Sequence, residues 1–441
     1  MSILSSAREK LRPILQSPWF MVPVFAGAAL SLIYQAPIEG TIGFVLLICA
    51  LLVLSDNTAL TLLPFSLLCM FVLKEYNSFD RFIKLWWLAI PVIPSMLFHL
   101  IAYRKKTQKN ILLYGLIGVA VAITFGGLGS ISAAEYFTGA NLYYVAGLGI
   151  VMVLMHLLIS SKYHNREGFD IQNYLCLVFY LIGIFGVFML FQHFGAHWAE
   201  IRSSGLPEIQ WSNNLSTFLM IAMPFGFYYS RKNALHMILT LLMFAAILLS
   251  GSRAPLIFGV AEYFICVIAF TVIDHKRWYV YIFPMVAILV GCYIFQEEVY
   301  NYFARILSFG KNVENEARFQ MAIRAWDEFR ANPLFGSGLG ATGRQDIYNP
   351  VKFAMNWYHS APFQIFGSLG IVGVLAYLFL WYTRVKVFLA HRTIFGYTVM
   401  LSQTGLFLMS MVNPGFFCPF PYEFFMVIMF AVLACQEPTT K

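Results

Sequence analysis

The chain has 441 residues, of which 60% are hydrophobic and 11% are charged. Soluble domains are about half apolar, so this composition excludes an ordinary soluble protein and is typical of a polytopic membrane protein. The net charge of +8 would suit a nucleic-acid partner. The placement of the basic residues favours a membrane protein instead, and we expect no nucleic-acid partner.

Fourteen apolar segments approach the length of about 20 helical residues that crosses a hydrocarbon core of about 30 Å. They cover residues 19–35, 40–55, 57–73, 82–103, 111–130, 141–160, 173–194, 213–230, 234–250, 254–273, 277–295, 359–382, 394–412 and 421–435. The predicted fold is therefore an all-α polytopic membrane protein with about 14 transmembrane helices. We expect a single membrane domain over 1–441, with no soluble domain before or after it.

Basic residues are unevenly divided between the two sets of loops. With the N-terminus inside, 17 of the 29 Lys and Arg lie in inner segments and 5 lie in short outer loops. This asymmetry is a strong positive-inside signal and places both termini in the cytoplasm. The basic residues Arg8, Lys10 and Arg12 precede the first apolar run, which we interpret as an uncleaved helix because the next run follows almost at once.

One outer loop, 296–358, is long enough to carry function of its own. Within it, NEARFQMAIRAWDEFRANP predicts an amphipathic helix with Phe319, Ile323, Trp326 and Phe329 on one stripe. We expect this helix to lie at the outer membrane–water boundary. The stretch LFGSGLGATG that follows predicts a flexible, turn-rich segment, and it lacks the strand and the Lys-Ser/Thr ending of a phosphate-binding loop.

Three strongly polar residues are predicted on the outer side although they are far apart in sequence: Arg202, Arg253 and His359. Arginine binds phosphate oxygens with a two-pronged fork and stays charged. Histidine can accept a proton from a hydroxyl near neutral pH. The combination fits a hydroxyl that attacks a glycosyl diphosphate, with cations for the leaving group and a base for the nucleophile. Lipid headgroup contacts or a helix cap remain the simpler interpretation of each residue taken alone.

Other polar features carry less weight. Glu262 lies inside an apolar segment, where a carboxylate is either functional or hydrogen-bonded to another helix. His193, His197 and His359 have no metal-ligand spacing, and six of the seven cysteines fall inside predicted spans. We therefore expect no required metal, no other cofactor and no disulfide framework.

Four stretches, taken in order, resemble the O-antigen ligase and O-antigen polymerase superfamily. They are RSSGLPEIQWSNNLSTFL, LLSGSRAPLIFG, RFQMAIRAWDEFRANPLFGSGLGATG and YHSAPFQIFGSLGIVGVL, and together they span about residues 200–380. Two positions depart from the family pattern: Ser360 stands where asparagine is usual, and Trp211-Ser212 stands where a proline often occurs.

The resemblance implies a membrane glycosyltransferase of the GT-C type in the bacterial inner membrane. Its donor would be an undecaprenyl-diphosphate-linked glycan, used on the periplasmic face. By the same resemblance Arg202 and Arg253 would hold the diphosphate, and His359 would activate or orient the acceptor. Arg318 would assist the phosphates or the fold, and Arg318, Asn214 and Tyr358 are the expected substrate-binding residues.

The catalytic part would be 196–382, between N-terminal helices over 1–195 and C-terminal helices over 383–441. Family members differ in acceptor, which is lipid A-core for ligases, the growing glycan for polymerases and a protein for O-oligosaccharyltransferases. We favour the ligase-like activity because one dominant outer loop lies near the C-terminal end. A lipid-linked oligosaccharide flippase is the alternative from another class, although transporters tend to bind at the midplane. A scaffold protein would have no need of the three polar residues.

Overall fold

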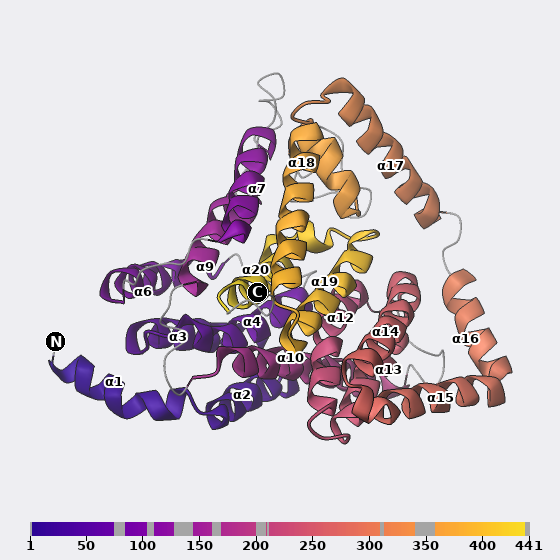
Figure 1. The fold of residues 1–441 in the computed structure, drawn as a ribbon, viewed down its shortest axis with the longest axis horizontal. Helices are drawn as coiled ribbons and strands as arrows, with labels where there is room; N and C mark the ends of the chain where they lie inside the picture. The colour runs from indigo at the N-terminus through magenta and orange to yellow at the C-terminus, as the bar shows by residue number, and fades with distance from the viewer. Residues whose placement is uncertain are drawn as a thin grey trace. The chain divides into compact units, whose positions relative to one another are not determined.

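The computed structural model describes residues 2–74, 84–103, 110–127, 144–160, 169–199, 209, 211–308, 313–339 and 358–436. Within these ranges all regular structure is helical (Figure 1). Each of the fourteen predicted apolar segments contains a helix. This agreement has a simple cause: an apolar segment surrounded by lipid must satisfy its backbone hydrogen bonds internally, and the helix does so.

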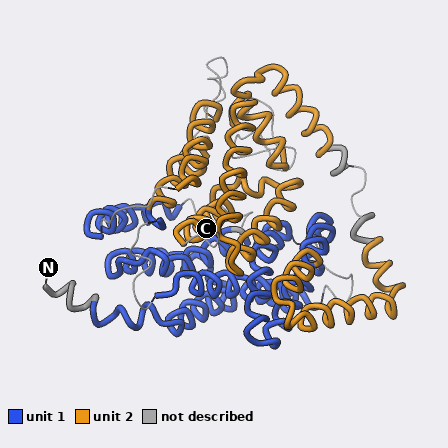
Figure 2. The backbone as a smooth tube through the Cα atoms, viewed as in Figure 1, with its two compact units in different colours: residues 1–108, 158–263 blue, residues 109–157, 264–441 orange. Residues whose placement is uncertain are grey.

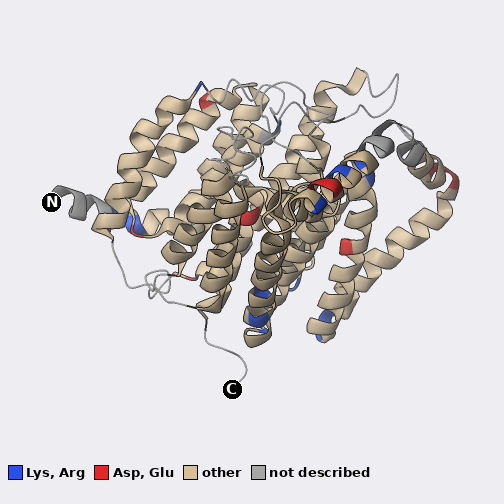
Figure 3. Ribbon diagram, turned by 90° about the horizontal axis from the view of Figure 1, so that it is seen from above, with Lys and Arg blue, Asp and Glu red and all other residues tan. Residues whose placement is uncertain are grey.

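Five of the described helices are long and apolar enough to cross a membrane, or six if a pair bent by 77° at residues 15–18 is one span. Seven further apolar helices are shorter, at 10 to 17 residues. Charged residues are sparse along most of the described helices (Figure 3). The structure therefore supports a multi-pass, all-α membrane protein, while the number of 14 spans remains a prediction.

The described chain consists of two compact units (Figure 2). Unit 1 comprises residues 1–108 and 158–263. Its helices are α1 (Ser2–Leu15), η1 (Pro18–Phe20), α2 (Met21–Ile33), α3 (Pro37–Leu54), η2 (Thr58–Thr61), α4 (Leu62–Lys74), η4 (Trp86–Leu88), α6 (Ala89–Ala102), α10 (Ile171–Ala196), α12 (Ser212–Ser230), α13 (His236–Leu249) and the first half of α14 (Arg253–Ile273).

The core of unit 1 is built on α10, which packs against α2, α4, α12 and α13. Small residues allow this close approach. A Cβ on Gly183 would lie 2.7 Å from the sulfur of Met243, and one on Gly186 would lie 3.0 Å from Leu219. Such glycine contacts are typical of membrane helix packing, where dispersion forces replace the hydrophobic effect. They fix α10 and α12, whose ends carry the polar residues described below.

Unit 2 comprises residues 109–157 and 264–441. Its helices are α7 (Ile111–Gly127), η6 (Val145–Val151), most of α9 (Met152–Ile159), the end of α14, η8 (His275–Arg277), α15 (Trp278–Ile294), α16 (Gln296–Ser308), α17 (Val313–Ala331), α18 (Ala361–Ala390), α19 (Ile394–Ser410), η9 (Gly415–Phe417), η10 (Pro419–Glu423) and α20 (Phe424–Ala434). The longest of them, α18, packs along α7 and against α17, α19 and α20.

A buried polar cluster ties three helical segments of unit 2 together. The Arg384 side chain of α18 is 1% exposed, donates to Gln403 Oε1 on α19 at 2.8 Å and forms an ion pair with Glu423. The pair explains why α18 continues to Ala390 although its predicted span ends at 382, because a paired and hydrogen-bonded guanidinium can stay inside a helix bundle. It also places the start of the last predicted segment, 421–435, beside the C-terminal half of α18.

Replacing Glu423 by leucine should destabilise the protein by about 3–5 kcal/mol, because Arg384 would remain buried without its counter-charge. Thermal unfolding in detergent measures the effect. The double variant Arg384→Met/Glu423→Leu should recover most of the loss, since it buries no unpaired charge. The exposed Lys386 provides the control: Lys386→Met should leave the unfolding temperature unchanged. Equal stability of Glu423→Leu and wild type would contradict a structural role for the pair.

Candidate functional site

The candidate residues fall in both units. In unit 1, Arg253 is the first residue of α14 and is half-buried. The preceding Gly251 has φ +76°, a left-handed conformation that suits glycine and turns the chain out of α13. A helix N-terminus carries partial positive charge from its free N–H groups. The guanidinium and the helix end therefore favour the same kind of ligand, an anion.

The start of α14 is joined to the start of α12. Ser252 Oγ donates to Asn213 Oδ1 at 2.6 Å, and Ser216 Oγ donates to Ser250 Oγ at 3.1 Å in the buried layer beside it. These two contacts fix two helix N-termini side by side. Asn214, the predicted substrate-binding residue, thus belongs to the same end of unit 1 as Arg253. Anions such as phosphate bind well at helix N-termini.

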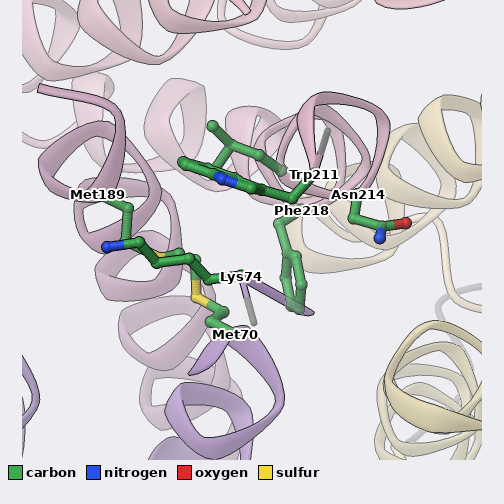
Figure 4. Close-up of a pocket in the computed structure, with 7 residues that line it drawn as sticks. Met70, Lys74, Met189, Trp211, Asn214 and Phe218 are labelled. Carbon is green, nitrogen blue, oxygen red and sulfur yellow. The ribbon is translucent and has the colours of Figure 1, made fainter. Parts of the chain in front are cut away.

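A small pocket lies at the end of unit 1 that includes the start of α12 (Figure 4). It is lined by Met70, Lys74, Met189, Trp211, Asn214, Leu215 and Phe218. Lys74 ends α4, and its Nζ donates to Gln192 Oε1 of α10 at 3.0 Å. Sequence reasoning counted Lys74 only as an outer-loop charge. A lysine directly after an apolar run was the signal that could have marked it.

Trp211, which belongs to one of the two departures from the family pattern, lines this pocket. It is the N-cap residue of α12, is 8% exposed and meets the His193 ring edge to face with centroids 5.6 Å apart. His193 in turn lies 4.3 Å from the His197 ring. Trp211 therefore joins α12 to the end of α10. Arg202, the other predicted diphosphate ligand, lies outside the described residues.

Glu262 is buried in the middle of α14, with 0% of its surface exposed. Neither carboxylate oxygen has a hydrogen-bond partner among the described residues. The helix–helix hydrogen bond considered from the sequence is thus not observed there. The adjacent Tyr263 ring stacks on Phe244 with centroids 4.3 Å apart, so this part of α14 packs mainly through aromatic contacts.

In unit 2, His359 lies in a sharp turn directly before α18. Its φ is +49°, which is uncommon for a residue with a side chain. Tyr358 before it is 2% exposed and belongs to a small core with Met321 and Ala325 of α17. The turn is therefore anchored on its N-terminal side by a buried ring, while His359 itself is half-buried.

Helix α17 confirms the helix predicted over 315–333, within two residues at each end. Phe319, Ile323 and Trp326 of the predicted stripe are exposed, with Phe319 65% exposed. The opposite face, which the pattern did not single out, packs Met321 and Ala325 against α18 and Tyr358. Trp326 and Phe329 of the stripe also contact the Phe366 ring of α18, with centroids 6.3 and 5.5 Å apart, while Phe319 and Ile323 stay exposed. The location of this helix at the membrane boundary remains a prediction. Arg318 is half-buried on the same helix.

The glycine-rich stretch after α17 completes a break in α18. Gly370 has φ +63° and interrupts the helix. The Ser337 and Gly338 N–H groups donate to the carbonyls of Gly367 and Ser368 at 3.0 Å, while Ile371 and Val372 donate back to Pro333 and Leu334 at 2.9 and 3.1 Å. Residues 333–338 thus satisfy the backbone groups that the break leaves open. The predicted turns are found at residues 334–339, where the backbone is hydrogen-bonded to α18, and 340–343 lie outside the described residues. The predicted flexibility stays a prediction.

Gly336→Ala should destabilise unit 2 by roughly 1–3 kcal/mol or more, because Gly336 has φ +70° and a Cβ there would overlap the backbone of Ser368 and Leu369. Thermal unfolding would record the loss. Gly291→Ala on α15 is the matched control, since nothing lies within 4 Å of its added Cβ, and it should be neutral or slightly stabilising. Equal unfolding temperatures for the two variants would show that the loop does not support the broken helix.

Comparison with known families bears on both units. Residues 238–378 match the model of the O-antigen ligase family. This segment is therefore similar to the O-antigen ligase family. The search of curated proteins gave no match. The predicted resemblance to the O-antigen ligase and polymerase superfamily is thereby confirmed for the segment that contains Arg253, Arg318, Tyr358 and His359.

The matched segment begins in α13 and ends within α18. It therefore includes the N-terminus of α14, the two helices of the predicted long loop and the break in α18. Arg202 and Asn214 precede the matched residues. The roles of the individual site residues remain predictions.

Proposed function

We propose that this protein is a membrane glycosyltransferase that transfers or polymerises an undecaprenyl-diphosphate-linked glycan on the periplasmic face of the bacterial inner membrane. The observation that carries the proposal is Arg253 at the N-terminus of α14 inside the segment that matches the O-antigen ligase family. A guanidinium and a helix N-terminus together favour a diphosphate more than any neutral ligand. The family match supports glycan transfer of the ligase or polymerase kind.

In the proposed reaction, Arg253 and Arg202 hold the donor diphosphate, and Arg318 adds a third cation or supports the fold. Asn214 lies one residue beyond Asn213, which accepts a hydrogen bond from Ser252, so it would contact the same donor. Arginine suits this role because its fork can contact two phosphate oxygens at once and remains charged as the leaving group gains negative charge.

His359 acts on the acceptor side. A hydroxyl oxygen of the acceptor attacks the anomeric carbon of the donor sugar, and the bond from that carbon to the diphosphate oxygen breaks. His359 takes the hydroxyl proton, and undecaprenyl diphosphate leaves with the bonding electron pair. Tyr358 stays a predicted substrate-binding residue, although its buried ring contributes chiefly to the packing that holds the turn.

The acceptor decides which kind of transferase this is. We propose a ligase-like activity with lipid A-core as the acceptor; polymerisation on the lipid carrier and transfer to a protein use the same donor chemistry. The test is product analysis by mass spectrometry after incubating the purified protein in lipid nanodiscs with a lipid-diphosphate glycan and each acceptor in turn. Glycan on lipid A-core is the expected product. A longer glycan on the carrier, or glycan on a protein, would replace the ligase assignment with the corresponding alternative.

A flippase predicts a different result in the same preparation. It would move the lipid-linked glycan between leaflets of a proteoliposome without any acceptor and would leave the glycan on its carrier. Release of undecaprenyl diphosphate that depends on the acceptor supports the transferase. Movement of an intact donor with no such release would overturn it.

A further inference from the structure

We propose that Gln364 is a positioning residue for His359, holding the backbone turn that presents the imidazole to the acceptor. The inference rests on the proposed function, in which His359 takes the acceptor proton. Gln364 is on the first turn of α18, and it is not among the residues expected from the sequence to contact a substrate. It acts through the backbone of Tyr358.

The turn at His359 needs support from outside itself. Its φ of +49° lies in the left-handed region, which residues with a Cβ adopt infrequently. The next residue, Ser360, is extended at φ −154°, ψ 125° and makes no side-chain cap to α18. A left-handed residue followed by an extended one is a strained backbone conformation, which persists only when neighbouring groups fix it.

Gln364 supplies a direct connection to that turn. Its side chain is fully buried at 0% exposure. Its Oε1 accepts a hydrogen bond from the Tyr358 N–H at 3.2 Å, and its Nε2 donates to Ser368 Oγ at 3.0 Å. Both ends of the buried amide are thus used, which is the condition under which a polar group stays inside a helix bundle. The contact to Tyr358 reaches across the turn that contains His359.

The other end of this connection is itself fixed. Ser368 is 0% exposed, and its carbonyl accepts from the Gly338 N–H at 3.0 Å, within the loop that completes the break in α18. A Cβ on Gly367 would lie 3.1 Å from the Tyr358 ring, so the ring and α18 are in close contact on the same side. The hydrogen bonds run from the loop to Ser368, then to Gln364, and then to the backbone before His359.

Loss of the Gln364 amide should therefore misplace the imidazole without removing it. A shift of about 1 Å in a reacting group can lower the rate by roughly a hundredfold. The donor would still bind, because its proposed ligands are the arginines. The expected signature is a lower kcat per folded protein with an unchanged KM for the donor. A general loss of folded protein also lowers the apparent kcat at constant KM, so the folded fraction of each variant has to be measured.

The experiment compares three variants in the nanodisc transfer assay, with kcat expressed per folded protein. Gln364→Met has similar size but no hydrogen bonds, and its kcat should fall about tenfold to a hundredfold with KM changed less than about twofold. Gln364→Glu keeps an oxygen that accepts from Tyr358 N–H, and it should restore kcat to within about threefold of wild type. Gln403→Met removes an equally buried glutamine of unit 2 that accepts from Arg384, and its kcat should stay at the wild-type value.

A second measurement does not depend on transfer. The rate at which diethyl pyrocarbonate modifies His359, followed by peptide mass spectrometry, reports the surroundings of the imidazole. It should change at least about threefold in Gln364→Met and remain unchanged in Gln403→Met and Gln364→Glu. An unchanged rate and kcat in Gln364→Met would overturn the positioning role. If the wild type transfers no glycan but the modification rates change as expected, the proposed function is overturned. The effect of Gln364 on the conformation of the His359 turn is then still supported.

Discussion

Alanine at position 359 is expected to abolish glycan transfer while leaving the protein folded. Proton transfer by a positioned general base contributes about 10²- to 10⁴-fold to a rate, so kcat should fall by at least about a hundredfold. The measurement is initial-rate transfer from a lipid-diphosphate glycan to its acceptor, together with thermal unfolding in the same detergent. Because His359 is only half-buried, its replacement should shift the unfolding temperature little.

The exposed His275 of η8 offers the matched control, since it belongs to a loop predicted on the cytoplasmic side. His275→Ala should retain wild-type transfer. Full activity of His359→Ala would remove the proposed base and with it the acceptor half of the mechanism. Loss of activity in both variants would point to a general requirement for folding instead.

Lysine at position 253 is expected to lower kcat/KM roughly tenfold to a hundredfold, although the charge is kept. An ammonium is a point charge and cannot reproduce the two parallel hydrogen bonds that a guanidinium makes to phosphate oxygens. Transfer assays over a range of donor concentrations measure the effect. The helix N-terminus still favours an anion in this variant, so some residual activity should remain, and Arg253→Ala should have less.

Arg277→Lys is the corresponding control, because Arg277 is exposed at the start of α15 and in a loop predicted to be cytoplasmic. It should transfer at the wild-type rate. Undiminished kcat/KM for Arg253→Lys would mean that only charge is needed at this position. The same result for Arg253→Ala would exclude Arg253 from the diphosphate site.

Much of the fold follows from local sequence. Each of the fourteen apolar segments contains a helix because backbone groups in lipid have no other partner. The helix over 315–333 is found as α17, which ends at Ala331 directly before Asn332-Pro333. The order of the motifs was likewise enough to indicate the O-antigen ligase family, which the match at 238–378 confirms.

Polar residues inside the bundle were harder to interpret. The predicted span ends at 382, two residues before Arg384, whereas α18 continues to Ala390. Its partner Glu423 lies 39 residues further along the chain, and no local pattern links the two. Lys74 was similarly treated as a loop charge, because its contact with Gln192 joins residues 118 positions apart.

By itself the sequence indicated an all-α membrane protein with a segment that resembles the O-antigen ligase family. It also singled out Arg253 and His359 as candidates, because hydropathy, charge and short motifs are properties of neighbouring residues. Only the tertiary structure decided that residues 333–338 fill a break in α18 and that Gln364 accepts a hydrogen bond from the Tyr358 N–H. The physical reason is that buried backbone and amide groups must find hydrogen-bond partners. Packing, and not the local pattern, sets which distant groups they meet.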